Sequence, residues 1–322
     1  MNNEKGLLYG GIVGDVLGVP FEFLSREEMA EKPFLGEMVS GGVHNQPLGH
    51  WSDDTSMTLC LIDAMLESFN LGRLALNFIR WESEGFWCAG DKYFDMGMTT
   101  RQAIDRLKFG TSPLSSGGKD FYSNGNGSLM RIAPFYFIFR EVSDDLLKLQ
   151  MVSNVSGITH AHPISVLSCY FYLLFFEQLS KFNNKHEAFA YAQFEFEDIL
   201  RKWLKSEDDK HKVFSKILDK KFASLPITHI HGSGYVVDTL ESAIWCFLNA
   251  DSFNEAMLYA INLGEDTDTV ASVCGSLSGY FFGFDNIPVN YLENLPKKEE
   301  LDDLIFKFLS KYSKERYVLN TR

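Results

Sequence analysis

The sequence has few cysteines, and no two of them form a short metal-binding or redox motif. The five that occur lie far apart among apolar neighbours: Cys60, Cys88, Cys169, Cys246 and Cys274. Isolated apolar thiols are typical of buried side chains in a reducing compartment. We therefore expect a cytoplasmic protein without a disulfide framework.

A long hydrophobic run is missing as well. The longest apolar stretch, residues 169–176, is far below the roughly 18 residues that a membrane-spanning helix needs. The apolar segment 6–19 is interrupted by Asp15 and is followed by no A-x-A cleavage site, unlike a secretory signal. The sequence thus predicts a soluble protein with no membrane partner.

Basic residues are outnumbered. The chain of 322 residues has 30 Lys and Arg against 43 Asp and Glu, a formal net charge of -13. This charge repels a nucleic-acid backbone, so a nucleic-acid partner is disfavoured, whereas bound cations are compatible with it. With 45% hydrophobic and 14% aromatic residues, the chain can bury a large core and should have little disorder beyond its ends.

Alternating strand patterns are scarce, whereas helical periodicity dominates. Apolar residues recur every three or four positions in five segments: 54–69, 163–182, 185–205, 252–264 and 297–314. Residues 37–49 favour irregular or short extended structure, and glycine-rich loops occupy 115–131 and 231–237. We expect an all-α fold.

Two acid-rich clusters precede apolar helical segments. They comprise Ser52, Asp53, Asp54 and Thr55 near the N-terminal end, and Asp266, Asp268 and Thr269 near the C-terminal end. One interpretation is helix capping, because Asp, Ser and Thr side chains accept hydrogen bonds from the free amides of a first turn. A cap needs one side chain, however, and neighbouring carboxylates repel where water is excluded. A divalent cation would remove that repulsion.

The donor types indicate which cation. Carboxylates and hydroxyls are hard oxygen ligands that suit Mg²⁺ or Mn²⁺, whereas the Cys and His ligands that Zn²⁺ prefers are absent from both clusters. Four carboxylates could hold two ions, an arrangement that polarises a substrate oxygen and activates water. Small residues after the second cluster would let another backbone approach closely: Ala271, Ser272, Gly275, Ser276, Ser278 and Gly279. If the helix that starts at the first cluster is the neighbour, residues 1–322 form a single domain around one metal site.

Six segments of the chain, in this order, carry a family pattern: GGIVGDVLGVPFEF (10–23), GHWSDDTSM (49–57), FDMGMTTRQAI (94–104), GNGSLMRIAP (125–134), ITHAHPISV (158–166) and GEDTDTVASVCGSLSG (264–279). Together they resemble the ADP-ribosylglycohydrolase family. The resemblance implies an all-α orthogonal helical bundle with a dinuclear Mg²⁺ or Mn²⁺ centre in a central cleft. It also implies hydrolysis of the glycosidic bond between ADP-ribose and an acceptor, such as an ADP-ribosylated protein side chain.

The resemblance assigns roles to residues of both clusters. It implies metal ligation by Ser52, Asp53, Asp54, Asp266, Asp268 and Thr269. Glu22 lies where the family has an acidic residue that closes over the metals and assists the reaction. In such a site Glu22, Asp54 or Asp268 would take the proton of the attacking water.

Three residues depart from the family pattern. Ser52 stands where many members have Thr and keeps the hydroxyl, so we expect no effect. Glu265 replaces a usual Gly and is expected to alter loop shape or substrate access. Met98 occupies a position where some members have Asn, and any role of that amide is lost.

The substrate needs contacts of its own. Backbone amides of glycine-rich loops can approach phosphate oxygens closely, although a plain turn before a helix has the same composition. The expected pyrophosphate site comprises Gly125, Asn126, Gly127 and Ser128. A second substrate loop is expected at Gly232, Ser233, Gly234 and Tyr235. Tyr235 would stack on the adenine or, alternatively, fill the core.

Two HxH pairs, His160 with His162 and His229 with His231, raise the alternative of a zinc site, which the lack of nearby cysteines disfavours. Because the first pair lies in a family segment, His160 is expected to support the substrate cleft by hydrogen bonds. A core or capping role is the alternative.

Three functions compete at this point. The first is a metal-dependent ADP-ribosyl hydrolase that acts as a monomer. The second is a catalytically silent ADP-ribose-binding or crystallin-like structural protein of the same fold. The third is a two-metal phosphoesterase, which would use His ligands and attack phosphorus. The intact ligand set favours the first.

Overall fold

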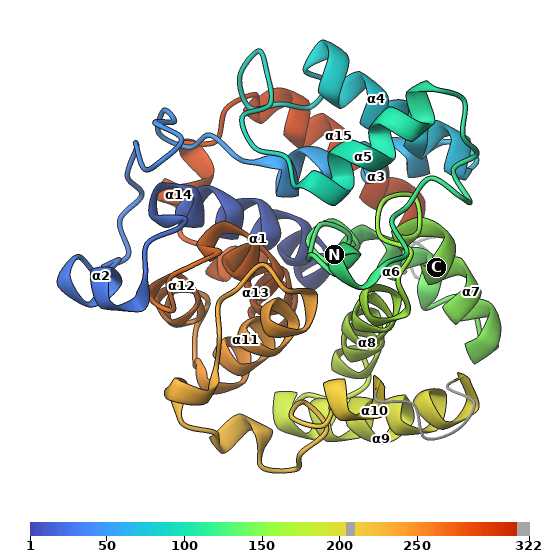
Figure 1. Cartoon of the computed structure of the whole chain (residues 1–322). Helices are drawn as coiled ribbons and strands as arrows, with labels where there is room; N and C mark the ends of the chain where they lie inside the picture. Colours follow the sequence, from blue (N-terminus) through green and yellow to red (C-terminus); the bar gives the residue numbers. More distant parts are fainter. Residues whose placement is uncertain (204–209, 314–322) are drawn as a thin grey trace, which may run out of the picture.

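The computed structural model describes residues 1–203 and 210–313, and in these ranges the chain consists of helices and loops (Figure 1). Extended backbone pairing among the described residues is limited to three isolated bridges, so no sheet forms there. The expected all-α fold is confirmed.

The α-helices, in chain order, are α1 (Asn2–Gly18), α2 (Arg26–Glu31), α3 (Asp53–Leu66), α4 (Leu71–Glu84), α5 (Met98–Lys108), α6 (Tyr136–Phe139), α7 (Asp145–Ser156), α8 (Pro163–Leu179), α9 (Lys185–Trp203), α10 (Lys210–Val213), α11 (Val236–Asn249), α12 (Phe253–Asn262), α13 (Thr267–Phe282), α14 (Val289–Glu293) and α15 (Lys298–Tyr312). Short 3-10 helices are η1 (Val19–Phe21), η2 (Phe121–Ser123), η3 (Ala133–Phe135), η4 (Phe222–Ser224), η5 (Ile227–His229) and η6 (Phe284–Asn286). The five helices predicted from periodicity are present as α3, α8, α9, α12 and α15. Positions 204, 205 and 314 of the predicted segments lie outside the described residues.

The antiparallel pair of α1 and α13 forms the centre of the molecule (Figure 1). Small residues line the seam between them. A Cβ added to Gly10 would lie 2.1 Å from the carbonyl oxygen of Gly275, and one added to Gly279 would lie 2.0 Å from that of Gly6. The small residues of α13 therefore do let another helix backbone approach closely, but that helix is α1 rather than α3. Because the pair is antiparallel, the residues that follow α1 reach the start of α13.

Aromatic side chains fill the core around this pair. α8 is buried along nearly its whole length, and the hydroxyl of Tyr172 donates a hydrogen bond to the carbonyl oxygen of Val273 on α13 at 2.8 Å. Ring contacts among Tyr136, Phe176 and Tyr280 join α6, α8 and α13. All five cysteines are buried and free, as predicted.

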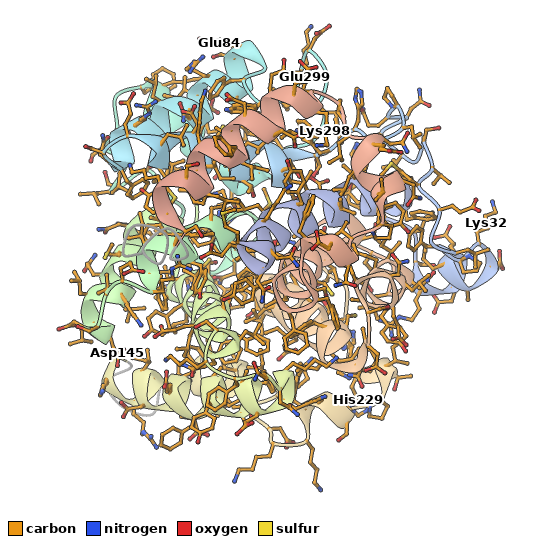
Figure 2. The ribbon with its side chains drawn as sticks, turned by 180° about the vertical axis from the view of Figure 1, so that it is seen from behind. Lys32, Glu84, Asp145, His229, Lys298 and Glu299 are labelled. Atoms are coloured by element: carbon orange, nitrogen blue, oxygen red, sulfur yellow. The ribbon has the colours of Figure 1, made fainter. Side chains whose placement is uncertain are left out.

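Charged side chains cover the outside. Figure 2 shows Glu84, Asp145 and Glu299 at the outline of the molecule, and all three are exposed. None of the helices in the described ranges combines the length and the apolarity that a bilayer crossing requires.

The connection from α2 to α3 is irregular, as predicted for residues 37–49, and contains a tight turn. The amide of Gly41 donates to the Gln46 carbonyl oxygen at 2.8 Å, and the Gln46 amide donates back at 3.1 Å. Gly42, at φ +68, packs so closely that a Cβ would lie 2.6 Å from the carbonyl oxygen of Pro20. The turn is therefore held against the segment that follows α1.

Candidate active site

α3 begins at Asp53, and other residues already cap its free amides. The Ser52 hydroxyl accepts a hydrogen bond from the Asp54 amide at 3.2 Å. The carboxylate of Asp15, on α1, accepts hydrogen bonds from the amides of Ser52 and Thr55, each at 3.0 Å. Capping therefore does not account for Asp53 and Asp54. In the described structure Asp54 Oδ1 is buried without a hydrogen-bond partner.

The start of α13 meets the start of α3. Asp266 precedes α13 without capping it, and its Oδ2 accepts a hydrogen bond from Asn126 Nδ2 at 2.8 Å. Thr269, in the first turn, donates a hydrogen bond from Oγ1 to Asp54 Oδ2 at 3.2 Å. The two acidic clusters, more than 200 positions apart in the chain, thus contact each other directly.

Glu22, in the turn that follows α1, adds a further carboxylate. One oxygen from each of Glu22, Asp266 and Asp268 lies within 4.8 Å of the other two. Burial, and then repulsion between neighbouring charges, raises the pKa of Glu22, Asp53, Asp54 and Asp268 above the usual range of a carboxyl. Crowded carboxylates lose their repulsion by binding protons or a cation, so this group could hold a metal ion.

Glu265 shapes the same turn through its backbone. Its amide donates to the Leu24 carbonyl oxygen and its carbonyl accepts from the Phe23 amide, both at 2.7 Å. Its φ of 66° lies in the left-handed region that glycine adopts without strain, which explains why a glycine is usual there. The side chain is exposed and does not line the neighbouring cleft, and an effect of Glu265 on loop shape or substrate access stays a prediction.

The acidic group opens into a cleft of about 290 Å³. The predicted site residues that line it are Glu22, Asp53, Asp54, Gly125, Asn126, Gly127, His160, Gly234, Asp266 and Thr269. The predicted residues that do not line it are Ser52, Ser128, Gly232, Ser233, Tyr235 and Asp268. Ser128 is fully buried, and its Oγ accepts a hydrogen bond from the Ser156 hydroxyl at 2.9 Å, so it faces the core rather than a phosphate.

The two glycine-rich loops pair with each other beside the cleft. The Asn126 amide donates to the Gly234 carbonyl oxygen at 3.1 Å, and the Val236 amide donates to the Asn124 carbonyl oxygen at 3.0 Å. Gly127 packs against a ring, because a Cβ there would lie 2.7 Å from His160 Cε1. Glycine is therefore required at this wall by close packing.

His160 is a buried, uncharged histidine in the cleft wall. Burial, and then the charge of Arg131, lowers its pKa to about 3. Its Nδ1 is hydrogen-bonded at 2.9 Å to Thr159 Oγ1, which also accepts from the Arg131 guanidinium at 2.9 Å. The expected supporting role of His160 is consistent with these contacts.

The zinc alternative has no support in the described part of the chain. The residue groups found there that could hold a metal ion include neither HxH pair. His229 and His231 are exposed, and Figure 2 shows His229 at the surface.

Asp95 and His44 reach the site although neither was predicted. Asp95, in the loop before α5, lines the cleft, and its charge contributes to the raised pKa of Glu22 and Asp53. His44, in the turn between α2 and α3, forms a hydrogen bond with Glu22. Asp95 lies in the recognised segment 94–104, which could have identified it, whereas no local pattern marks His44.

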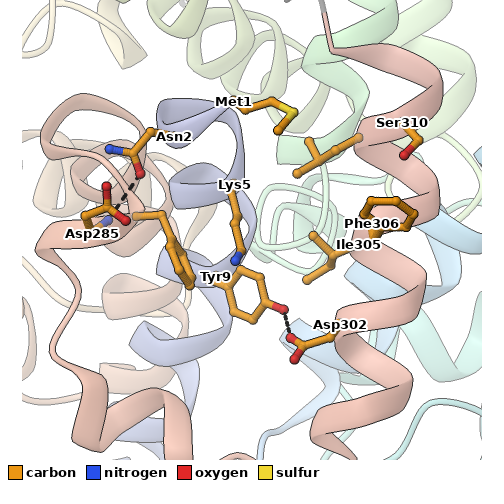
Figure 3. A pocket seen from close by; sticks show the side chains of 11 residues that line it. Met1, Asn2, Lys5, Tyr9, Asp285, Asp302, Ile305, Phe306 and Ser310 are labelled. Atoms are coloured by element: carbon orange, nitrogen blue, oxygen red, sulfur yellow. Dashed lines mark hydrogen bonds between the residues drawn. The ribbon is translucent and has the colours of Figure 1, made fainter. Parts of the chain in front are cut away.

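A cavity larger than this cleft lies elsewhere in the described structure. It measures about 540 Å³ and is lined by residues of α1, η6 and α15 (Figure 3). In it the Tyr9 hydroxyl donates a hydrogen bond to Asp302, and Lys5 Nζ lies 3.7 Å from the centroid of the Phe284 ring. This cavity shares no lining residue with the cleft, so the crowded carboxylates rather than cavity size mark the candidate site.

Comparisons with known proteins agree with the geometry. The profile of the ADP-ribosylglycohydrolase family matches residues 2–317. The chain is 32% identical over 310 residues to ADP-ribosylarginine hydrolase Tri1 of Serratia proteamaculans (strain 568), covering 94% of this chain and 78% of that protein. It is 25% identical over 303 residues to ADP-ribosyl-[dinitrogen reductase] glycohydrolase of Rhodospirillum rubrum, covering 92% and 90%.

A solved structure described as an ADP-ribosylglycohydrolase-related protein complex superposes with a TM-score of 0.76. The two chains are 28% identical, and the match covers 95% of this chain and 96% of the other. Sequence, fold and the meeting of the two acidic clusters lead to one assignment. The chain belongs to the ADP-ribosylglycohydrolase family, which hydrolyses ADP-ribose linkages.

Proposed function

We propose that this protein is a cation-dependent hydrolase that releases ADP-ribose from ADP-ribosylated arginine side chains. The observation that carries the proposal is the contact between the acidic starts of α3 and α13, in which Asp53 and Asp54 are not needed as caps. The arginine linkage is supported by two relatives, each named ADP-ribosylarginine hydrolase and each 32% identical to this chain.

The donor set of the two clusters suits Mg²⁺ or Mn²⁺. Its members are carboxylate and hydroxyl oxygens, and the unpartnered Asp54 Oδ1 is available to a cation. The residues that would hold two ions are Ser52, Asp53, Asp54, Asp266, Asp268 and Thr269. When bound, such ions would act as Lewis acids on the ribose hydroxyls and lower the pKa of a nearby water.

The carboxylates have two tasks in this reaction. Cleavage at the anomeric carbon develops positive charge on the ribose, which the surrounding negative charges stabilise. One carboxylate must also accept the proton of the attacking water. Glu22 is better placed for this than Asp54 or Asp268, because it lines the cleft and is not among the proposed ligands.

The glycine-rich wall would bind the ADP part of the substrate. Gly125, Gly127 and Gly234 line the cleft without side chains, so phosphate oxygens can approach the backbone closely. The His160 ring lies behind this wall, with Nε2 3.6 Å from the position of a Cβ on Gly125. Because this histidine is uncharged, it can contribute a hydrogen bond without adding a charge.

Asp95 would bind the acceptor. A guanidinium is planar and permanently charged, and a carboxylate can pair with two of its N–H groups. Asp95 lines the cleft and lies outside the two metal-binding clusters, so its carboxylate is available to a cationic acceptor. Recognition of the arginine acceptor would therefore depend on the side chain of Asp95.

The proposal is tested by incubating the protein with an ADP-ribosylarginine peptide and Mg²⁺ or Mn²⁺ while free ADP-ribose is followed. We expect release that stops with a chelator and in Asp53→Ala. Asp285→Ala, in the second cavity, is the matched control and should retain release. Tight binding of ADP-ribose without release would instead support the catalytically silent alternative, and AMP or phosphate as product would support the phosphoesterase.

A further inference from the structure

We propose that His44 is a positioning residue that holds the Glu22 carboxylate in place at the cation site. The inference rests on the proposed function, in which Glu22 accepts the proton of the attacking water. It assigns a role to a side chain outside the six family segments. The contact itself is short, with 2.5 Å between His44 Nε2 and Glu22 Oε2.

The contact is nearly closed to water. The side chains are 14% exposed for His44 and 4% exposed for Glu22. Among the described residues, His44 is the one hydrogen-bonding partner of the Glu22 carboxylate. A hydrogen bond that is shielded from water is stronger than one exposed to it, so this contact can set the orientation of Glu22.

Glu22 needs such a restraint because its neighbours repel it. The carboxylates of Asp95, Asp266 and Asp53 all lie close enough to act on its charge. Repulsion alone would turn the Glu22 side chain away from the clusters. The hydrogen bond between His44 and Glu22 opposes that rotation.

The imidazole is itself held in position. Its ring contacts Phe23 and Phe94, with centroid distances of 5.9 Å and 5.1 Å. The carbonyl oxygen of His44 accepts a hydrogen bond from Gln46 Nε2 at 3.0 Å, within the tight turn of residues 41–46. That turn packs against Pro20, two residues before Glu22, so both partners share one support.

The geometry favours positioning over metal ligation by His44. Ligand-type atoms of Glu22, His44 and Asp95 do lie within 4.8 Å of one another. Neighbouring ligands of an octahedral ion with bonds of about 2.0–2.1 Å are roughly 2.9 Å apart. The His44 to Glu22 distance of 2.5 Å is shorter than this separation, which fits a short, direct hydrogen bond better than two ligands of one ion.

The test compares His44→Ala with His50→Ala on the ADP-ribosylarginine peptide. His50 lies in the same connection, beside Gly90 rather than Glu22, and serves as the matched control. We expect His44→Ala to lower kcat roughly 10- to 100-fold with little change in KM, as for other partners that orient a reacting group. His44→Gln, or imidazole added to His44→Ala, should restore part of the rate by returning an N–H donor.

Two further readouts separate positioning from a structural role. Glu22→Gln combined with His44→Ala should lose no more activity than Glu22→Gln alone, because both act on one step. In NMR spectra without cations, the ¹⁵N shift of His44 Nε2 should change in Glu22→Gln and stay unchanged in Glu265→Gln. The inference would be overturned if His44→Ala were as active as the wild type, or if the activity losses of Glu22→Gln and His44→Ala added up in the double variant. It would also be overturned if His44→Ala weakened Mn²⁺ binding as much as Asp53→Ala does.

Failure of the inference and failure of the proposed function are distinguishable. If the wild type releases ADP-ribose and His44→Ala equals it, only the inference fails. If the wild type releases none, the proposed function fails. In that case the ¹⁵N shift of His44 Nε2 still tests the inference. An unchanged shift in Glu22→Gln would rule out a contact that positions Glu22.

Discussion

Among single side chains, Asp15 determines how the neighbouring acidic pair is interpreted. It accepts hydrogen bonds from the Ser52 and Thr55 amides, the task that a capping interpretation gives to Asp53 or Asp54. An acid from another helix thus caps α3. The pair at the start of α3 is left to face the cleft.

Replacing Asp95 by Asn should weaken recognition of the cationic acceptor. Loss of one charge-assisted contact costs about 1.5–3 kcal/mol, so kcat/KM for an ADP-ribosylarginine peptide should fall roughly 10- to 100-fold. The affinity for free ADP-ribose should not change, because that molecule lacks the guanidinium. Steady-state kinetics and calorimetry measure the two quantities.

The control for this change is Asp91→Asn, an exposed acid in the same connection between α4 and α5 that does not line the cleft. It should behave as the wild type in both measurements. A loss of ADP-ribose affinity in Asp95→Asn equal to the loss in kcat/KM would show that Asp95 acts on the common part of the substrate.

The candidate site could be predicted where its residues are contiguous. Each acidic cluster is a short run at a helix start, so its spacing is visible in the chain. Asp15 and His44 were missed because each acts by contact with a distant segment, and one polar side chain carries no periodic signal. Ser128 was expected beside the phosphates but does not line the cleft, since the composition of a glycine-rich loop does not show which side chains turn inward.

Among the helices, α1 was not predicted from periodicity because it is a buried helix. It is buried on nearly all sides, so it has no polar face and no amphipathic stripe. α9, α12 and α15 expose one face, and the pattern predicted them closely. The glycines of α1 weaken its apolar pattern in the sequence, and they are also the residues that let α1 approach α13 closely.

Gly275→Ala should disrupt the seam between α1 and α13. The new Cβ would lie 2.1 Å from the Gly10 carbonyl oxygen, which is backbone and cannot move without shifting a helix. Overpacking of this kind costs about 1–3 kcal/mol and occasionally more, so we expect a loss of about 3 kcal/mol. Urea unfolding of both proteins measures the change in midpoint.

Gly72→Ala is the matched control, because the nearest atom to its Cβ is the side-chain Asn70 Oδ1 at 3.3 Å. Ala there should leave stability unchanged or raise it by about 0.4–1 kcal/mol. Equal stability of Gly275→Ala and the wild type would mean that the helices are not packed as closely as the seam requires.

For the molecule as a whole, the acidic centre should link stability to pH. Without ions, burial and repulsion raise the folded-state pKa of Glu22, Asp53, Asp54 and Asp268 above the unfolded values of about 4. A raised folded pKa gives stability that is present below the unfolded pKa and is lost as pH rises through the folded pKa. The ion-free protein should therefore have a lower Tm at about pH 8 than at about pH 5.5.

Cations should offset that loss, because they bind the ionised carboxylates of the folded state. An ion at about 100 times its dissociation constant raises the free energy of unfolding by about 2.7 kcal/mol. This gain should be larger at the higher pH. Calorimetric scans with chelator and with Mg²⁺ or Mn²⁺ measure both effects, and Asp54→Asn should reduce them. A Tm that rises with pH in chelator, or that responds to neither ion, would contradict the expectation.

The proposed cation site at the starts of α3 and α13 can be tested directly by anomalous diffraction from crystals soaked in Mn²⁺. The expected result is anomalous density bounded by Asp53, Asp54, Asp266 and Asp268, and its loss in crystals of Asp54→Asn. Manganese bound elsewhere in the crystal, with no density between these four carboxylates, would contradict a cation centre there.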